Sequence, residues 1–242
     1  MTRHDVVVVV PTYNEAATIR SVANAVMATG MRLLVVDDGS PDGTGQIADD
    51  LSSDDDRIAV LHRAGKQGLG PAYAAGFATA MDAGAAIVCE MDADLSHDPA
   101  DLVRLVGAID EGADVAIGSR YVAGGGTEGW PLHRRWLSRG GNLYARRMLG
   151  LGVADATAGF RAYRSEAVRK LDPWSCLASG YGFQIEMTWR AERLGLDIRE
   201  VPIVFRDRTL GTSKMSTAIA MEAVGLVTRW GIRRMTGRVD AG

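Results

Sequence analysis

Asp92 and Asp94 stand one residue apart in the segment EMDADLSHDP, directly after the apolar stretch AAIVC. Two carboxylates this close disfavour each other's ionisation. A divalent cation would hold both in the charged form, because such ions prefer carboxylate oxygens. For a D-x-D that stands alone, the alternative is a solvated acidic turn with Asp98 capping the next helix. Polar clusters elsewhere that converge on this segment would therefore favour a metal site.

Alternating strands and helices would bring such clusters together. Apolar, often β-branched runs predict strands at 5–10, 32–36, 57–62, 85–89 and 114–119, and a further strand at 197–205. Segments with helical spacing predict helices at 16–29, 72–82 and 99–111, and another that ends at Leu51. This alternation is typical of βαβ units, so the sequence predicts an α/β fold with a mostly parallel sheet flanked by helices.

Polar clusters follow four of the predicted strands. They read PTYNE, DDGS, DAD and SRY. Because the carboxyl ends of parallel strands meet at one edge of a sheet, where ligands bind in such folds, we expect these clusters to form one site. Within DDGS, either Asp37 or Asp38 would contact a ligand while the other orients the turn. His97 is interpreted as a turn residue rather than a catalytic group.

The composition excludes several classes of protein. The 242 residues suit one sizeable domain or a domain with a small appendage, and a net charge of -3 argues against a general nucleic-acid binder. Neither Cys89 nor Cys176 lies in a CxxC motif, which fits a reducing cytoplasm. No G-x-G-x-x-G follows the first strand, and no P-loop or G-x-S-x-G elbow occurs. Acidic residues at the sheet edge, joined to basic loops, instead suit a metal-bound diphosphate.

Two later segments could contact a membrane surface, although no stretch reaches the roughly 18 apolar residues of a spanning helix. Region 130–149 combines tryptophan and leucine with five arginines, as an interfacial helix would. Four of these arginines alternatively form a solvated helical face, namely Arg135, Arg139, Arg146 and Arg147. A last helix is predicted at 215–235, and one of its faces is apolar. This face would meet a membrane or, alternatively, pack on the sheet or on a partner; it consists of Ile219, Ala223, Leu226, Val227 and Trp230.

Six segments, in this order and spacing, resemble the family 2 glycosyltransferases, and within them the dolichol-phosphate (polyprenol-phosphate) mannosyltransferases. They are PTYNE, VVDDGSPDGT, MDADLSHDP, IGSRYV, WPLHRRWLSRGGN and LGTSK. The resemblance spans Val6 to about Lys214. It implies a nucleotide-sugar-binding, Rossmann-like GT-A catalytic domain over residues 1–214, followed by a C-terminal amphipathic helix and basic tail over 215–242.

The resemblance also implies roles for individual residues. Contacts to the nucleotide sugar fall on Pro11, Tyr13, Glu15, Val36, Asp38, Asp92, Ala93, Asp94, Arg120, Arg208 and Lys214. The acceptor phosphate would meet Arg120, Arg134 and Ser138, and the catalytic set is Asp92, Asp94, Arg120 and Arg134. The metal, Mg²⁺ or Mn²⁺, would be held by Asp92, Asp94 and Ser96. Many relatives carry Gln in place of Ser96, so this last contact departs from the family pattern.

The implied reaction moves mannose from GDP-mannose to a polyprenyl (dolichyl) phosphate with inversion. A phosphate acceptor needs no general base, because it is largely dianionic at neutral pH. We expect a cytoplasmic protein at the membrane's cytoplasmic face, with room for a separate membrane-anchoring partner. Two alternatives stay open: a glucosyltransferase that uses UDP-glucose, and a non-catalytic nucleotide-sugar-binding subunit that regulates a partner.

Overall fold

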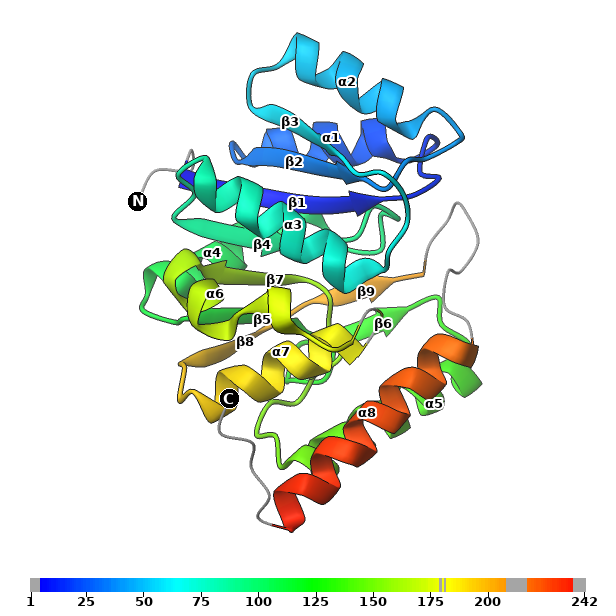
Figure 1. The fold of residues 1–242 in the computed structure, drawn as a ribbon, viewed down its shortest axis with the longest axis vertical. Coiled ribbons are helices and arrows are strands. Elements are labelled where there is room, and N and C mark those ends of the chain that lie inside the picture. The colour runs from blue at the N-terminus through cyan, green and yellow to red at the C-terminus, as the bar shows by residue number, and fades with distance from the viewer. Residues whose placement is uncertain (1–4, 179, 181, 208–216, 237–242) are drawn as a thin grey trace.

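A seven-stranded sheet forms the centre of the molecule, in the order β3-β2-β1-β4-β7-β5-β8 (Figure 1). The computed structural model describes residues 5–178, 180, 182–207 and 217–236. Strand β7 runs antiparallel to β4 and β5, and the remaining pairs of this sheet are parallel. The strands are β1 (Val6–Thr12), β2 (Arg32–Asp37), β3 (Ile58–His62), β4 (Ile87–Glu90), β5 (Val115–Ser119), β6 (Gly126–Glu128), β7 (Arg161–Arg164), β8 (Ile198–Pro202) and β9 (Val204–Arg206).

Helices cover both faces of the sheet, and two of them extend beyond it (Figure 1). In chain order they are α1 (Ile19–Ala28), α2 (Thr44–Asp54), α3 (Leu69–Asp82), α4 (Leu102–Asp110), α5 (Leu132–Leu149), α6 (Ser165–Leu171), α7 (Gly182–Arg193) and α8 (Thr217–Met235). The α/β fold with a mostly parallel sheet is therefore confirmed.

The alternation of side chains along β1 builds two separate hydrophobic cores. Val7 and Val9 face the cluster that contains Phe77 of α3, whereas Val8 faces the cluster that contains Ile19 of α1. Successive side chains of a strand point to opposite faces of the sheet, so an unbroken run of valines is needed where both faces are covered. This is why the N-terminal apolar run becomes a central strand.

Two features of the sheet differ from the prediction. The antiparallel strand β7 was not predicted, although it lies between β4 and β5. The segment 197–205, predicted as one strand, is divided into β8 and β9, which belong to different sheets. Pro202 ends β8 because proline has no backbone N–H for the ladder, and β9 then pairs in parallel with β6.

Helices α5 and α8 lie side by side at the end of the molecule that is farthest from β3 (Figure 1). The hydroxyl groups of Tyr144 and Thr228 are 2.6 Å apart across this pair. On α8, Trp230 is 3% exposed and stacks on Trp189 of α7 at a ring separation of 5.4 Å, and Val227 is 1% exposed. Val227 and Trp230 therefore pack on the protein, so the membrane alternative is wrong for these two residues.

No helix formed by residues 5–178, 180, 182–207 and 217–236 has both the length and the apolar character to cross a bilayer.

Candidate functional site

The loop after β1 is fixed by the turn that follows β2. Consecutive backbone N–H groups of the loop donate to side chains of the turn, in the pairs Asn14–Ser40 (3.1 Å), Glu15–Thr44 (2.9 Å) and Ala16–Asp42 (3.0 Å). Within the β1–β2 ladder, Pro11 is the direct partner of Val36. The structure therefore brings the PTYNE and DDGSPDGT segments together at one edge of the sheet, as predicted.

The two aspartates after β2 have different surroundings. Asp37 accepts hydrogen bonds from the Thr12 hydroxyl (3.2 Å) and from the backbone N–H (3.1 Å) and hydroxyl (2.5 Å) of Ser40. Asp37 is thus the residue that orients the turn. Asp38 is 5% exposed and accepts from Nη1 of Arg63 at 2.6 Å. Burial raises the pKa of the Asp38 carboxyl, although the charge of Arg63 opposes the change.

Two other predicted base contacts are constrained by packing. The Val36 side chain is fully buried in the core, so only its backbone can reach a ligand. The Tyr13 ring is half-buried, and the Lys66 ammonium lies 4.7 Å from its centroid. Lys66 and Arg63 both come from the loop between β3 and α3, which the sequence did not single out.

The D-x-D segment follows β4 and turns sharply. Asp92 is half-buried and accepts a long hydrogen bond (3.4 Å) from the Tyr73 hydroxyl, whereas Ala93 and Asp94 are 3% and 9% exposed. Asp94 accepts from the backbone N–H of Ser96 at 3.1 Å. Leu95 between them has a φ of 61°, a conformation that side chains other than glycine rarely adopt. The turn therefore holds both carboxylates at the carboxyl end of β4.

A cation at this segment would rest on few protein ligands. Among the described residues, no group of three or more His, Cys, Asp and Glu side chains is arranged to hold a metal. The Ser96 side chain is 1% exposed, and its hydroxyl has no hydrogen-bond partner within the described residues. A buried hydroxyl of this kind fits an additional polar ligand. Asp92, Asp94 and Ser96 thus suit a cation that takes its remaining ligands from a bound diphosphate.

A buried carboxyl lies two residues before Asp92 and was not singled out from the sequence. Glu90 is fully buried, and this burial raises its pKa to about 7, although the charge of Arg161 and the amide of Gln184 act in the opposite direction. A Cβ atom added at Gly159 would lie 3.7 Å from Nε2 of Gln184 and 3.8 Å from Oδ2 of Asp92. Gly159 thus lies between the amide and the D-x-D carboxylate.

Arg120, after β5, is held by a buried aspartate that the sequence did not reveal. Its Nε and Nη2 donate to the two carboxylate oxygens of Asp155 at 2.7 and 2.8 Å, and Nη2 also donates to Thr157 at 2.8 Å. The Asp155 side chain is 0% exposed. Burial alone would raise the pKa of Asp155, but the hydrogen bonds and charge of Arg120 outweigh it and lower the pKa.

Arg134, at the start of α5, makes a more accessible ion pair. Its Nη1 donates to Asp207 at 2.6 Å, and both side chains are 32% exposed. The guanidinium carbon lies 4.2 Å from the Trp130 ring centroid, and that of Arg120 lies 5.8 Å from the same centroid. The structure therefore gathers the two predicted acceptor arginines around one aromatic ring.

The remaining acceptor-side predictions have different outcomes. The Ser138 hydroxyl lies 2.7 Å from the hydroxyl of Tyr121, on the side of α5 that faces the loop after β5. Arg208 and Lys214 lie outside the described residues.

Phe205 on β9 connects the D-x-D segment to the arginines. Its ring lies 5.1 Å from the His97 ring and 5.3 Å from the Trp130 ring, and the guanidinium carbon of Arg120 lies 5.8 Å from its centroid. The backbone N–H of Arg206 also donates to the carbonyl of Ser96 at 3.0 Å. Strand β9 thus joins the carboxylates and the two arginines into one site.

His97 lies in a bend after the D-x-D segment, which agrees with the predicted turn residue, and its ring packs within this site. The ring is 5% exposed and stacks on Phe160 at 4.7 Å. Burial lowers its pKa to about 4, with Asp94 and Arg120 among the charges that act on it. His97 is therefore neutral near pH 7, and its burial in the stack argues against a role as general base.

The sequence matches one described family and is similar to characterised proteins. The family described as glycosyl transferase family 2 matches this sequence over residues 7–172. The chain is 50% identical over 236 residues to a polyprenol monophosphomannose synthase from Mycolicibacterium smegmatis, covering 96% of this chain and 88% of that protein. It is 49% identical over 231 residues to an undecaprenyl-phosphate mannosyltransferase from Micrococcus luteus, with 94% of each covered.

Solved structures share the fold. A glucosyl-3-phosphoglycerate synthase from Mycobacterium tuberculosis, in complex with Mn²⁺, UDP and glucosyl-3-phosphoglycerate, has a TM-score of 0.65 at 25% identity. The alignment covers 98% of this chain and 81% of that one. A mannosyltransferase from Pyrobaculum calidifontis, in complex with GDP-Man and Mn²⁺, has a TM-score of 0.59 at 16% identity, covering 100% of this chain and 77% of that one. The GT-A type of sheet is therefore shared with these structures.

Proposed function

The chain belongs to glycosyl transferase family 2, and on that premise we propose that it transfers mannose from GDP-mannose to the phosphate of a polyprenol. The names of the two relatives at 50% and 49% identity support mannose and a polyprenyl phosphate as the transferred sugar and the acceptor. The observation that carries the proposal is the grouping of the D-x-D segment, Arg120 and Arg134 around Phe205 and Trp130.

The donor would lie along the sheet edge between β1 and β4. Pro11, Tyr13 and Glu15, with the backbone of Val36 and the carboxylate of Asp38, would contact the nucleoside. Arg208 and Lys214 would approach its phosphates, as the family resemblance implies. GDP-mannose is proposed on the same resemblance, through the WPLHRR and GTSK segments.

Asp92, Asp94 and Ser96 would hold a divalent cation, Mg²⁺ or Mn²⁺, at the donor diphosphate. The 25%-identical synthase solved with Mn²⁺ and UDP supports a divalent ion that binds together with the nucleotide. When bound, such an ion offsets the negative charge of the diphosphate leaving group. Ala93, which is buried between the two aspartates, would let the diphosphate approach the backbone of the turn.

The reaction would form a bond between an oxygen of the lipid phosphate and the anomeric carbon of mannose. The bond from that carbon to the donor diphosphate breaks on the opposite side, and GDP leaves with the electron pair. The second pKa of a phosphate monoester lies near 6, so the attacking oxygen needs no proton acceptor at neutral pH. The neutral, buried state of His97 is consistent with a site that works by positioning and charge stabilisation.

Arg120, Arg134 and Ser138 would hold the acceptor phosphate. Arg120 enters the reaction already fixed by Asp155, so little conformational freedom is lost when it meets the phosphate. Arg134 would replace its bond to Asp207 with bonds to the phosphate.

The acceptor is a membrane lipid, and α5 offers a surface to reach it. Leu132, Trp136 and Leu137 are 71%, 73% and 69% exposed beside the arginines of the same helix. Large exposed apolar groups next to cations are typical of a helix that lies in a membrane interface. We infer peripheral association at the cytoplasmic face of the membrane.

A panel of labelled nucleotide sugars tests the proposal. The purified chain is incubated with polyprenyl phosphate, Mg²⁺ and, in separate reactions, GDP-mannose or UDP-glucose. We expect lipid-linked mannose from GDP-mannose alone. Formation of lipid-linked glucose would show that UDP-glucose, and not GDP-mannose, is the donor. Binding of GDP-mannose without lipid-dependent turnover would favour a non-catalytic regulatory subunit.

A further inference from the structure

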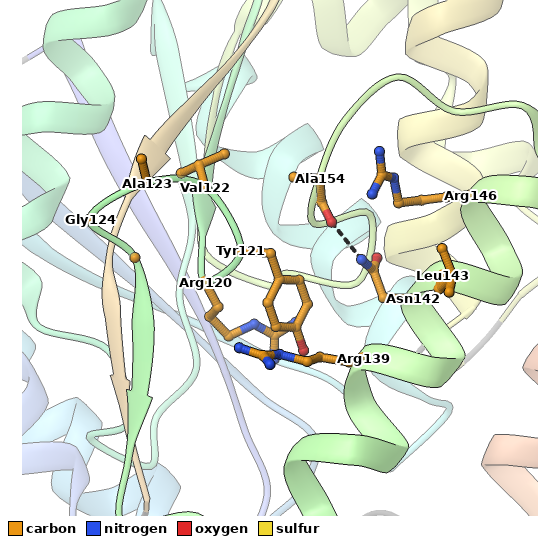
Figure 2. Close-up of a pocket in the computed structure, with 11 residues that line it drawn as sticks. Arg120, Tyr121, Val122, Ala123, Gly124, Arg139, Asn142, Leu143, Arg146 and Ala154 are labelled. Atoms are coloured by element: carbon orange, nitrogen blue, oxygen red, sulfur yellow. Dashed lines mark hydrogen bonds between the residues drawn. The ribbon is translucent and has the colours of Figure 1, made fainter.

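A cavity of about 550 Å³ lies between the loop after β5 and the middle of α5 (Figure 2). The loop contributes residues 120–125, and α5 contributes Arg139, Asn142, Leu143 and Arg146. The Asn142 amide donates to the carbonyl of Ala154 and so fixes one wall. The volume lies within the range of about 300–1,000 Å³ that is usual for small-molecule sites.

The cavity carries positive charge that the described residues do not neutralise. Arg120, at its edge, is paired with Asp155. Arg139 and Arg146 have no carboxylate partner within the described residues, and no Asp or Glu of these residues lines the cavity. Nε of Arg146 is buried without a hydrogen-bond partner there. A ligand oxygen in the cavity could satisfy this donor, and the two arginines without carboxylate partners favour a ligand that is anionic.

The surface next to the cavity is apolar. A second hollow of about 320 Å³ shares Arg139 with the cavity and is also lined by Leu132 and Trp136. Leu143, which lines the cavity itself, is 42% exposed. Cations within the cavity and large apolar side chains beside it match the two parts of a lipid, a charged headgroup and a hydrocarbon chain.

We propose that this cavity binds the phosphate-bearing headgroup of an anionic bilayer lipid. Arg139 and Arg146 would hold it at a position next to the acceptor phosphate, and Arg120 forms the border between the two. The site would fix how α5 lies on the membrane, and it does not depend on which sugar is transferred. Under this proposal Arg139 and Arg146 bind a ligand, in contrast to the alternative that they belong only to a solvated helical face.

Calorimetry with soluble ligands tests the site without the general attraction of a charged surface. The full chain is titrated with dihexanoyl phosphatidylglycerol below its micelle concentration, with inorganic phosphate, and with farnesyl phosphate as a short acceptor. Arg146→Gln removes the buried donor, and Arg146→Lys retains the charge. Arg147→Gln is the matched control, since Arg147 is exposed on the same helix and does not line the cavity.

We expect phosphatidylglycerol to bind the wild type, and to bind Arg146→Gln about ten- to a hundredfold more weakly. Arg139→Gln should weaken phosphatidylglycerol binding only about three- to tenfold, because Arg139 is exposed and its charge is screened by solvent and salt. Arg146→Lys should recover part of the loss, and Arg147→Gln should bind like the wild type. All variants should keep the wild-type affinity for the nucleotide sugar, which shows that they are folded.

Three results would overturn the proposal. Inorganic phosphate that binds as tightly as phosphatidylglycerol would indicate a free-phosphate site. An equal loss in Arg147→Gln would indicate general surface charge. Competition between farnesyl phosphate and phosphatidylglycerol would make the cavity part of the acceptor site. Failure of the mannose-transfer proposal is detected separately, by the donor panel in detergent.

Discussion

Two arginine–aspartate pairs stand on the acceptor side of the site, and they differ in burial. Arg120 and Asp155 have side chains that are 9% and 0% exposed, and two guanidinium nitrogens bond two carboxylate oxygens. Arg134 and Asp207 are both 32% exposed and are joined through Nη1 at 2.6 Å. Both guanidinium groups nevertheless lie near the ring of Trp130.

The difference in burial predicts a difference in role. Removing one partner of a buried ion pair lowers the free energy of unfolding by several kcal/mol, because the other charge stays buried without a partner or solvent. A pair that is about one-third exposed contributes only about 0–1 kcal/mol, so its partners can separate at small cost. Arg120 is therefore a fixed part of the site, and Arg134 is the arginine that can exchange its aspartate for a lipid phosphate.

Removing Asp155 should cause the largest loss of stability. Asp155→Ala leaves the Arg120 charge buried, and we expect the free energy of unfolding to fall by about 3–5 kcal/mol. The matched change Asp207→Ala should cost less than about 1 kcal/mol. Urea unfolding of both variants measures the contrast, with Asp155→Asn as a milder substitute. Equal losses in the two alanine variants would remove the distinction between the pairs.

Removing Arg134 should weaken the binding of the acceptor and leave the binding of the donor unchanged. Arg134→Ala should raise KM for polyprenyl phosphate about ten- to hundredfold, since a charged hydrogen bond is worth about 1.5–3 kcal/mol. Arg134→Lys should restore only part of this, because the planar two-pronged contact is lost. Donor affinity, measured by calorimetry, should stay near normal. A loss of donor binding, or an equal effect of the control Arg135→Ala, would contradict the acceptor role.

Acidification should lower the free energy of unfolding, because the buried His97 must then be protonated. His97 lies beside Arg120 and Asp155, and its burial lowers its pKa from 6.5 to about 4. Between these values the unfolded chain binds more protons than the folded one, so the free energy of unfolding falls as pH drops from about 6.5 to about 4. Urea unfolding of metal-free protein across this range should show a shallower slope for His97→Gln. Identical slopes would exclude His97 as the cause.

Removing Asp207 should have the smallest effect, and in the opposite direction to Arg134→Ala. Asp207→Asn removes the competitor for the Arg134 guanidinium, so KM for polyprenyl phosphate should fall about two- to fivefold. Steady-state kinetics with varied lipid measures the change. The gain should disappear in the Arg134→Ala background; a gain that persists there would show that Asp207 acts through another group.

Local patterns were enough to predict most of the fold. The β-branched run before Pro11 and the alternation of apolar strands with helices depend on neighbours in the chain, and the parallel part of the sheet was predicted from them. Strand β7 was missed because its pairing with β4 and β5 joins residues far apart in sequence. The division at Pro202 had a local signal, the missing N–H of proline, that could have been used.

The site was predictable only in part, for the same reason. Asp92 and Asp94 were singled out by their spacing after a strand, and Arg120 and Arg134 by the family resemblance. In the structure the rings of Phe205 and Trp130 lie between the D-x-D segment and the two arginines. Their partners Asp155 and Asp207 are 35 and 73 residues away from the arginines that they bind. A lone acid within the apolar segment LGVADATAGF is nevertheless a usable sign of a buried, paired carboxylate, and Asp155 is that residue.

The formation of polyprenyl-phosphate mannose by the purified, metal-stripped chain is the most direct test of the central claim. With GDP-mannose, polyprenyl phosphate and added Mg²⁺ or Mn²⁺, we expect lipid-dependent transfer. In EDTA, or with Asp92→Asn or Asp94→Asn at an unchanged melting temperature, we expect none, because two adjacent carboxylates are best explained by a shared cation. Full transfer in EDTA would contradict a metal-dependent mannosyltransferase.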